Sequence, residues 1–101
     1  MPQQASDYTN DARIVSVEAR TVSIPLDNPT AFSTRQVLAR DYTLVRVRTA
    51  DGHQGIGFCY GGSRAGVLVT HAVRELFRAT LVGQSALRVE GLWQDMYRDS
   101  L

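Results

Sequence analysis

Cysteine and histidine are scarce in this chain, and their scarcity excludes several kinds of site. The 101 residues include one cysteine, Cys59, so no disulfide can form within the chain and the fold depends on its core. The two histidines, His53 and His71, occur in no CxxC or HExxH pattern, so the spacing of a zinc site is missing. No motif marks a nucleophilic serine. We therefore expect neither a metal site nor a self-contained active site in this chain.

Long apolar runs and an excess of charge are also missing. The apolar stretches fall far short of the ~20 residues that cross a bilayer. The first thirteen residues are polar and lack the apolar centre of a signal peptide. The net charge of +1 gives no electrostatic footprint for nucleic acid or an anionic membrane. These features predict a cytoplasmic protein that binds neither nucleic acid nor membranes.

Single residues that might carry chemistry have simpler structural interpretations. His53 follows a turn and is expected to be exposed, and His71 is expected at the boundary of a helical apolar stripe. Cys59 lies in an apolar strand and is interpreted as a small buried hydrophobe. Trp93 belongs to an aromatic stripe that we expect in the core. The GxG at residues 55–57 falls inside a strand, whereas a dinucleotide fingerprint places its glycines between strand and helix.

Alternating apolar residues predict three strands, over residues 14–25, 37–49 and 54–60. In the first of these strands the apolar positions change parity after Ala19, which predicts a bulge near Arg20 and Thr21. Pro25 has no N–H to donate and is expected to end the strand.

The remaining segments are assigned to a leader, connections and helices. Residues 1–13 are interpreted as a disordered leader and residues 27–35 as a loop. Asp51-Gly52 suits a hairpin turn. Ser63 is predicted to cap a helix that runs to about Leu81, with Leu68, Val69, Ala72, Val73, Leu76 and Thr80 on its apolar stripe. Gly83 is predicted to terminate that helix, and Ser85 to cap a second. The fold class is α+β: a three-stranded antiparallel meander followed by a helical layer.

Three segments in this order carry a family resemblance: VEARTVSIPL at residues 17–26, VRVRTADGHQGIGF at 45–58, and LVGQSA at 81–86 followed by VEGLWQDM at 89–96. Together they resemble the N-terminal capping domain of the mandelate racemase / muconate lactonizing enzyme family, in the enolase superfamily. The resemblance covers residues 14–101. Its pattern departs from many members at Ile56-Gly57-Phe58, where Trp-Gly-Glu is usual, and at Ser85-Ala86, where Asp-Pro is usual. The sequence from Gly57 to Tyr60 is closer to acid-sugar dehydratases.

The resemblance implies a chemistry that lies outside this chain. In such enzymes a (β/α) barrel follows the capping domain, and carboxylates of the barrel hold Mg²⁺ while a Lys or His base removes a proton next to the substrate carboxylate. A barrel needs ~250 residues. We therefore expect the parent to be a lyase or isomerase acting on a small carboxylate or acid sugar, with Mg²⁺ bound by the barrel and none by this chain. The 101 residues alone are expected to be inactive.

The resemblance also implies which residues would meet the substrate. Two loops of the capping domain close over the barrel mouth in this family and shape its specificity. By position they correspond here to residues 27–35 and 59–64. The candidate contacts are Phe32, Ser33, Thr34, Arg35, Tyr60 and Arg64.

Two functional hypotheses remain open at this point. In the first, the chain is the cap of a barrel enzyme, with the barrel domain as its partner and a homo-oligomer as its assembly. In the second, it is a free-standing protein-interaction module without catalytic activity.

Overall fold

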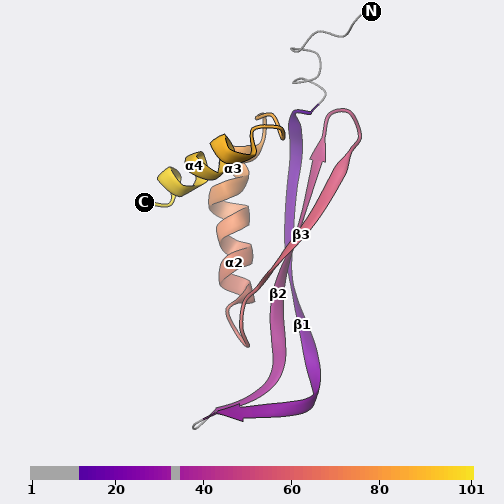
Figure 1. Cartoon of the computed structure of the whole chain (residues 1–101), viewed down its shortest axis with the longest axis vertical. Coiled ribbons are helices and arrows are strands. Elements are labelled where there is room, and N and C mark those ends of the chain that lie inside the picture. Colours follow the sequence, from indigo (N-terminus) through magenta and orange to yellow (C-terminus); the bar gives the residue numbers. More distant parts are fainter. Residues whose placement is uncertain (1–11, 33–34) are drawn as a thin grey trace, which may run out of the picture.

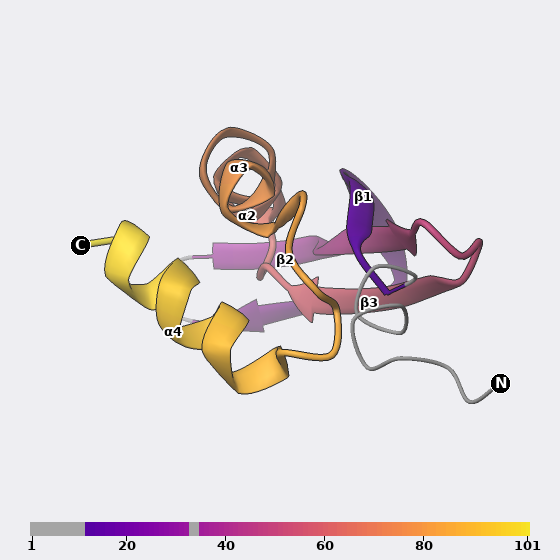
Figure 2. The same ribbon diagram turned by 90° about the horizontal axis from the view of Figure 1, so that it is seen from above.

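The chain folds as a twisted three-stranded sheet with helices on one face (Figures 1 and 2). The structure, a computed structural model, describes residues 12–32 and 35–101, and the side chains of 28–37 lie outside the description. Most of the predicted leader therefore lies outside it too. In chain order the elements are β1 Ile14–Phe32, β2 Arg35–Thr49, β3 Gln54–Tyr60, α2 Gly66–Ala72, the π-helical turn η1 Val73–Phe77, α3 Arg78–Leu81 and α4 Val89–Asp99.

The sheet confirms the predicted meander. Its order is β1-β2-β3, and both neighbouring pairs are antiparallel. The turn between β2 and β3 closes through the Gly52 N–H, which donates to the Thr49 carbonyl over 3.1 Å, and Gly52 has a φ of 89°. Glycine is favoured there because a side chain would strain a positive φ.

The first strand is longer than predicted, and its irregularities lie elsewhere. No bulge lies near Arg20 or Thr21, which pair in continuous register with Leu44 and Thr43; the register shifts lie instead between Ile14 and Ser16 and between Pro25 and Thr30. The apolar pattern changes parity because Val22 lies on the sheet face opposite to the one that the helices cover, and that face also carries apolar side chains. The prediction mistook a change of face for a change of register.

The strand also continues past Pro25. This residue pairs with Ala39, the ladder is interrupted, and pairing resumes at Thr30 with Val37 and ends at Phe32 with Arg35. The predicted loop at 27–35 is therefore the outer part of a long β-hairpin. Since β1 is an edge strand, a proline costs only a local interruption.

The first helix begins later than predicted, and its start is fixed by backbone contacts rather than by Ser63. The Ala65 N–H donates to the Gly61 carbonyl over 2.9 Å, and the helix starts at Gly66 without a side-chain cap. It runs through η1 to Leu81. Gly83 follows with a φ of 93°, as predicted for a terminator.

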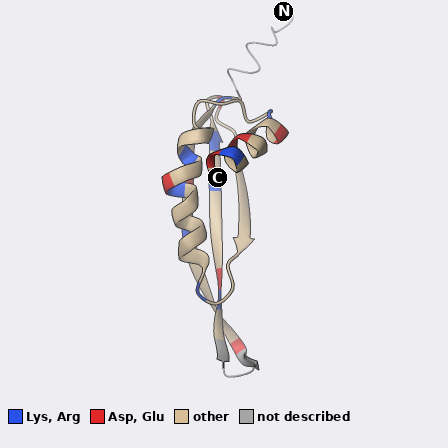
Figure 3. Cartoon of the chain, turned by 90° about the vertical axis from the view of Figure 1, so that its left-hand side faces the viewer, with Lys and Arg blue, Asp and Glu red and all other residues tan. Residues whose placement is uncertain are grey.

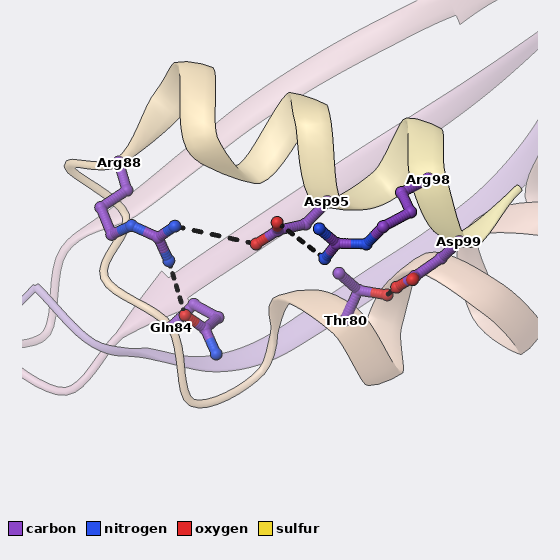
Figure 4. Close-up of polar contacts among 6 residues, drawn as sticks. All are labelled: Thr80, Gln84, Arg88, Asp95, Arg98 and Asp99. Atoms are coloured by element: carbon purple, nitrogen blue, oxygen red, sulfur yellow. Dashed lines mark hydrogen bonds and ion pairs between the residues drawn. The ribbon is translucent and has the colours of Figure 1, made fainter.

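Ser85 does not cap α4 directly. Its hydroxyl accepts from the Leu87 N–H over 3.2 Å and its carbonyl from the Arg88 N–H over 3.2 Å, which makes a turn just ahead of the helix. Charged side chains then hold α4, which carries adjacent basic and acidic segments (Figure 3). Figure 4 shows Arg88, which donates a hydrogen bond to Gln84 and forms an ion pair with Asp95. Arg98 also pairs with Asp95, and the Thr80 hydroxyl of α3 donates to Asp99.

A chain of threonine hydroxyls ties the helix to the sheet. Thr43 is fully buried and donates to the Gly66 carbonyl over 2.9 Å. Since a hydroxyl has one hydrogen, the 3.0 Å contact between Thr43 and Thr70 requires Thr70 to donate. The 2.7 Å contact between Thr70 and Thr21 is then donated by Thr21. The relay runs from Thr21 through Thr70 and Thr43 to the helix backbone.

The same helix face covers the edge of β1 further along. Arg74 donates from Nε to the Ala19 carbonyl over 2.9 Å, and Arg78 donates from Nε to the Val17 carbonyl over 2.9 Å. Arg74 and Arg78 are four residues apart on the helix and bond to carbonyls two residues apart on β1.

The start of β1 is covered by residues 83–86. The Ile14 N–H donates to the Gln84 carbonyl and the Gly83 N–H to the Ile14 carbonyl, each over 2.8 Å. With Arg74 and Arg78, these bonds occupy backbone groups that would otherwise remain open at the sheet edge, where unpaired strands promote association.

The core is small. Its buried centre is Ile14, Val17 and Leu92, and the partly buried residues packed on it are Val45, Val47, Val73, Leu81 and Ala86. Several residues predicted to be buried are exposed: Cys59, Leu68 at 71%, and Trp93 at 62%, which stacks on Tyr97. Their exposure shows that the described residues provide no surface that covers them.

Gly66 offers a test of how tightly the helix sits on the sheet. A Cβ at Gly66 would lie 2.8 Å from both Thr21 Cγ2 and Asp41 Cβ. We expect Gly66→Ala to cost about 1–3 kcal/mol of unfolding free energy through overpacking. Gly91→Ala is the matched control, because its Cβ would meet only the flexible Arg88 side chain, and it should be neutral or gain up to about 1 kcal/mol in helix propensity. Equal denaturation midpoints for the two variants would contradict the close packing.

Candidate functional site

The second predicted loop begins at an aromatic cluster on the open face of the sheet, the face opposite the helices. Tyr60 is the last residue of β3 and pairs with Tyr42 on β2. The Tyr42 ring lies 5.6 Å from the Tyr60 ring and 6.0 Å from the Phe58 ring, centroid to centroid. Tyr60 remains 55% exposed. The cluster thus presents aromatic surface while its rings support one another.

Asp41 fixes this loop to the sheet through its backbone. Its N–H donates to the Gly62 carbonyl over 2.6 Å, and its carbonyl accepts from the Gly61 N–H over 2.8 Å. In the ladder between β1 and β2, Asp41 pairs with Ser23. One buried residue therefore joins the second loop to the base of the long hairpin. Asp41 was not among the predicted site residues, and the available signal was a single acidic residue in a strand that carries four arginines.

Arg64 lies in the turn after Gly62 and is exposed. The described part of the chain contains no carboxylate within ion-pair distance of it. Its guanidinium is therefore available to a carboxylate, which it would bind through a planar fork of donors.

The first predicted loop is the outer end of the hairpin. Phe32 ends β1 and pairs with Arg35, the first residue of β2, but neither side chain is described. Ser33 and Thr34 lie outside the described residues. Figure 1 shows the lower part of this hairpin turning toward the side on which α2 begins.

The two predicted loops lie at the same end of the sheet but not side by side. Tyr42 marks the level of the second loop, and Arg35 lies seven residues further along β2, roughly 23 Å in an extended strand. The hairpin therefore projects well beyond Tyr60. Any molecule that touches both would fill the space between them.

At the opposite end of the sheet the described residues form the turn between β2 and β3. His53 is an exposed turn residue, as predicted, and its Nδ1 lies 2.9 Å from Asp51. A hydrogen bond from the Thr49 hydroxyl, and a lesser one from His53, lower the pKa of Asp51. His71 is exposed on α2. Within residues 12–32 and 35–101, no three His, Cys, Asp or Glu side chains gather as metal ligands, and no helix is long and apolar enough to span a membrane.

Comparisons with known proteins identify relatives of this domain. Residues 14–101 match the family profile described as mandelate racemase / muconate lactonizing enzyme, N-terminal domain. The 3,6-anhydro-alpha-L-galactonate cycloisomerase of Streptomyces coelicolor is 33% identical over 76 residues, which are 73% of this chain and 21% of the relative.

Solved structures agree. A racemase from Streptomyces coelicolor A3(2) with bound magnesium is 29% identical over 85% of this chain and 24% of its own, with a TM-score of 0.80. Muconate lactonizing enzyme from Pseudomonas fluorescens shares the fold, with 20% identity, a TM-score of 0.78, and coverage of 87% of this chain and 25% of its own. The chain thus spans a fifth to a quarter of the length of these relatives.

Exposed apolar side chains lead to a prediction about association. Ile56 and Phe58 on the open face are 72% and 73% exposed, and Trp93 and Tyr97 on α4 are more than half exposed. Such patches favour contact with other protein surfaces. We expect the chain to self-associate, with a mass by light scattering that rises with concentration. Phe58→Ser should reduce this more than Val82→Ser, a smaller exposed residue, and a clean monomer at high concentration would contradict it.

Proposed function

The chain belongs to the mandelate racemase / muconate lactonizing enzyme family as its N-terminal domain, and from that premise we propose that it closes over the active site of a barrel domain and shapes its substrate specificity. The proposed domain covers residues 14–101. Ala12 and Arg13, which the sequence assigned to a leader, bond to it: their carbonyls accept from the Ala86 and Ala50 N–H groups over 2.9 and 2.8 Å. The parent would be a Mg²⁺-dependent lyase or isomerase of the cytoplasm that acts on a small carboxylate or acid sugar.

The observation that carries this proposal is the arrangement of the two loops. Both leave the sheet at the same end, and Asp41 joins their bases through backbone hydrogen bonds and strand pairing. A cap that closes an active site must deliver separate segments to one mouth from a rigid support. The hairpin, which turns toward the α2 side, and the turn at 61–65 start from one support, which favours the proposal.

The metal chemistry belongs to the parent rather than to this domain. A related racemase from Streptomyces coelicolor binds magnesium. The described residues here do not fit such a site, because they bring no cluster of carboxylates together. In the proposed parent, Mg²⁺ would be held by barrel residues and would stabilise negative charge that develops on the substrate.

The cap's contribution is binding and the exclusion of water. Tyr60 offers an aromatic face and a hydroxyl, and Arg64 a guanidinium suited to a carboxylate. On the hairpin, Phe32 would pack against substrate or the barrel rim, while Ser33, Thr34 and Arg35 would meet polar groups. Closure of this kind strengthens electrostatic interactions inside the site.

Exposed apolar surface also supports a second reading, a free-standing interaction module. The coding sequence separates the two hypotheses. A reading frame that continues past Leu101 into strands ending in Asp or Glu ligands supports the cap, and a natural stop codon there supports the module.

A turnover assay tests where the chemistry resides. With Mg²⁺ and a panel of acid sugars, the 101-residue chain should show no turnover, because its described residues bring no cluster of metal ligands together and the proposed base belongs to the barrel. Measurable turnover by the chain alone would refute the assignment of catalysis to a separate barrel.

Substitutions in the full-length enzyme test the loop assignment. We expect Arg64→Gln and Tyr60→Ala to raise KM by about tenfold or more for at least one acid substrate, with smaller changes in kcat, because they remove binding to parts of the substrate that do not react. His53→Ala, at the opposite end of the sheet, is the matched control and should leave both constants unchanged. Unchanged KM in both loop variants would rule out a substrate role for the second loop.

A further inference from the structure

Four arginines converge on a hollow along the edge of β1. The hollow has a volume of about 460 Å³, and its lining residues are four arginines, Glu18, the apolar Leu44 and Ile56, and Ala19 and Val45. The arginines are Arg20 of β1, Arg46 of β2, Arg74 of η1 and Arg78 of α3. Since Glu18 contributes the only negative charge, the lining carries a net charge of +3 at neutral pH.

The Glu18 carboxylate is already paired with Arg46. Glu18 accepts a hydrogen bond from Arg46 Nη2 over 2.9 Å. This bond and the charge of Arg46 lower the pKa of Glu18, so its carboxylate stays ionised and paired near neutral pH. Arg20, Arg74 and Arg78 have no carboxylate within ion-pair distance in the described ranges.

The guanidinium groups are also held in place. Arg74 and Arg78 each donate from Nε to a β1 carbonyl, which orients the planar group, and their Nη groups bond to no acceptor in the described part of the chain. Arg46 Nε is buried and lacks an acceptor there. Anchored forks of donors lose little freedom when they bind, which favours planar, two-oxygen ligands.

We propose that this hollow binds a carboxylate, with Arg20, Arg46 and the anchored Arg74 and Arg78 as its donors and Leu44 and Ile56 as its apolar wall. The site lies four residues along β3 from Tyr60, roughly 13 Å, so it is separate from the proposed substrate loops. It does not depend on the proposed function. The carboxylate can come from a small acid or from an acidic side chain of another polypeptide segment.

Two probes distinguish these sources. Tricarballylate, a small tricarboxylate, and a tetraglutamate peptide would each be titrated into the ¹⁵N-labelled chain, while the Nε–Hε signals of the arginines are followed at low and high ionic strength. Binding of tricarballylate supports a small acid. Binding of tetraglutamate alone supports a polypeptide. In both cases added salt should weaken binding, because the contacts are ionic.

Single substitutions then locate the site. The Arg20 side chain forms no hydrogen bond or ion pair with the described residues, so Arg20→Gln should weaken binding roughly tenfold without loss of structure. Arg48→Gln removes the same charge from the same sheet face outside the hollow, and should retain the affinity within about twofold. The proposal is overturned if neither probe binds, or if the two variants weaken binding equally, which would indicate attraction to net charge alone.

Discussion

The helix layer is held on the sheet by contacts from helical residues 66, 70, 74 and 78 to residues 17–21 of β1. Gly66 packs against Thr21, Thr70 bonds to Thr21 and Thr43, and Arg74 and Arg78 cap strand carbonyls. Glycine is required at position 66 because the side chains of Thr21 and Asp41 leave no room for a Cβ. The apolar core beside these contacts is small, so orientation of the helix depends on polar contacts to an unusual degree.

This constraint places the second loop. The turn at 61–65 lies between the end of β3 and the start of the helix, and Gly61 packs so closely against Gly66 that a Cβ would lie 2.7 Å from its nitrogen. Once the helix is registered on β1, the turn has little freedom, and Asp41 joins it to the base of the hairpin. The positions of Tyr60 and Arg64 in the second loop therefore depend on how the helix packs on the middle of the sheet.

The two faces of the domain are unequal in what they leave uncovered. The helix face buries Val17, Ala19 and Thr43, while the open face presents an aromatic cluster beside arginines. Apolar residues on both faces explain the parity change along β1. A domain that spans a quarter of its relatives' length can leave such surfaces for other parts of a longer protein.

Local chemistry was sufficient to predict some features from sequence. Gly52 and Gly83 predicted the hairpin turn and the helix end because few residues other than glycine adopt a positive φ. Alternating apolar residues predicted the three strands. The apolar patterns wrongly predicted burial for Cys59 and Trp93. Both residue types are common in cores, yet no described residue covers these two side chains. Ser63 failed as a cap because Gly61 and Gly66 set the helix start. The family resemblance is confirmed by the profile match, whereas the substrate roles of Tyr60 and Arg64 stay predictions.

A double-mutant cycle on the threonine relay tests the polar registration of helix on sheet most directly. Thr43→Val and Thr70→Val should each lower the unfolding free energy by about 1–3 kcal/mol, because each leaves a buried partner unsatisfied. We predict that the double variant costs less than the sum by about 1 kcal/mol or more, since the two hydroxyls bond to each other. Costs that add within about 0.3 kcal/mol would show independent sites and contradict the relay.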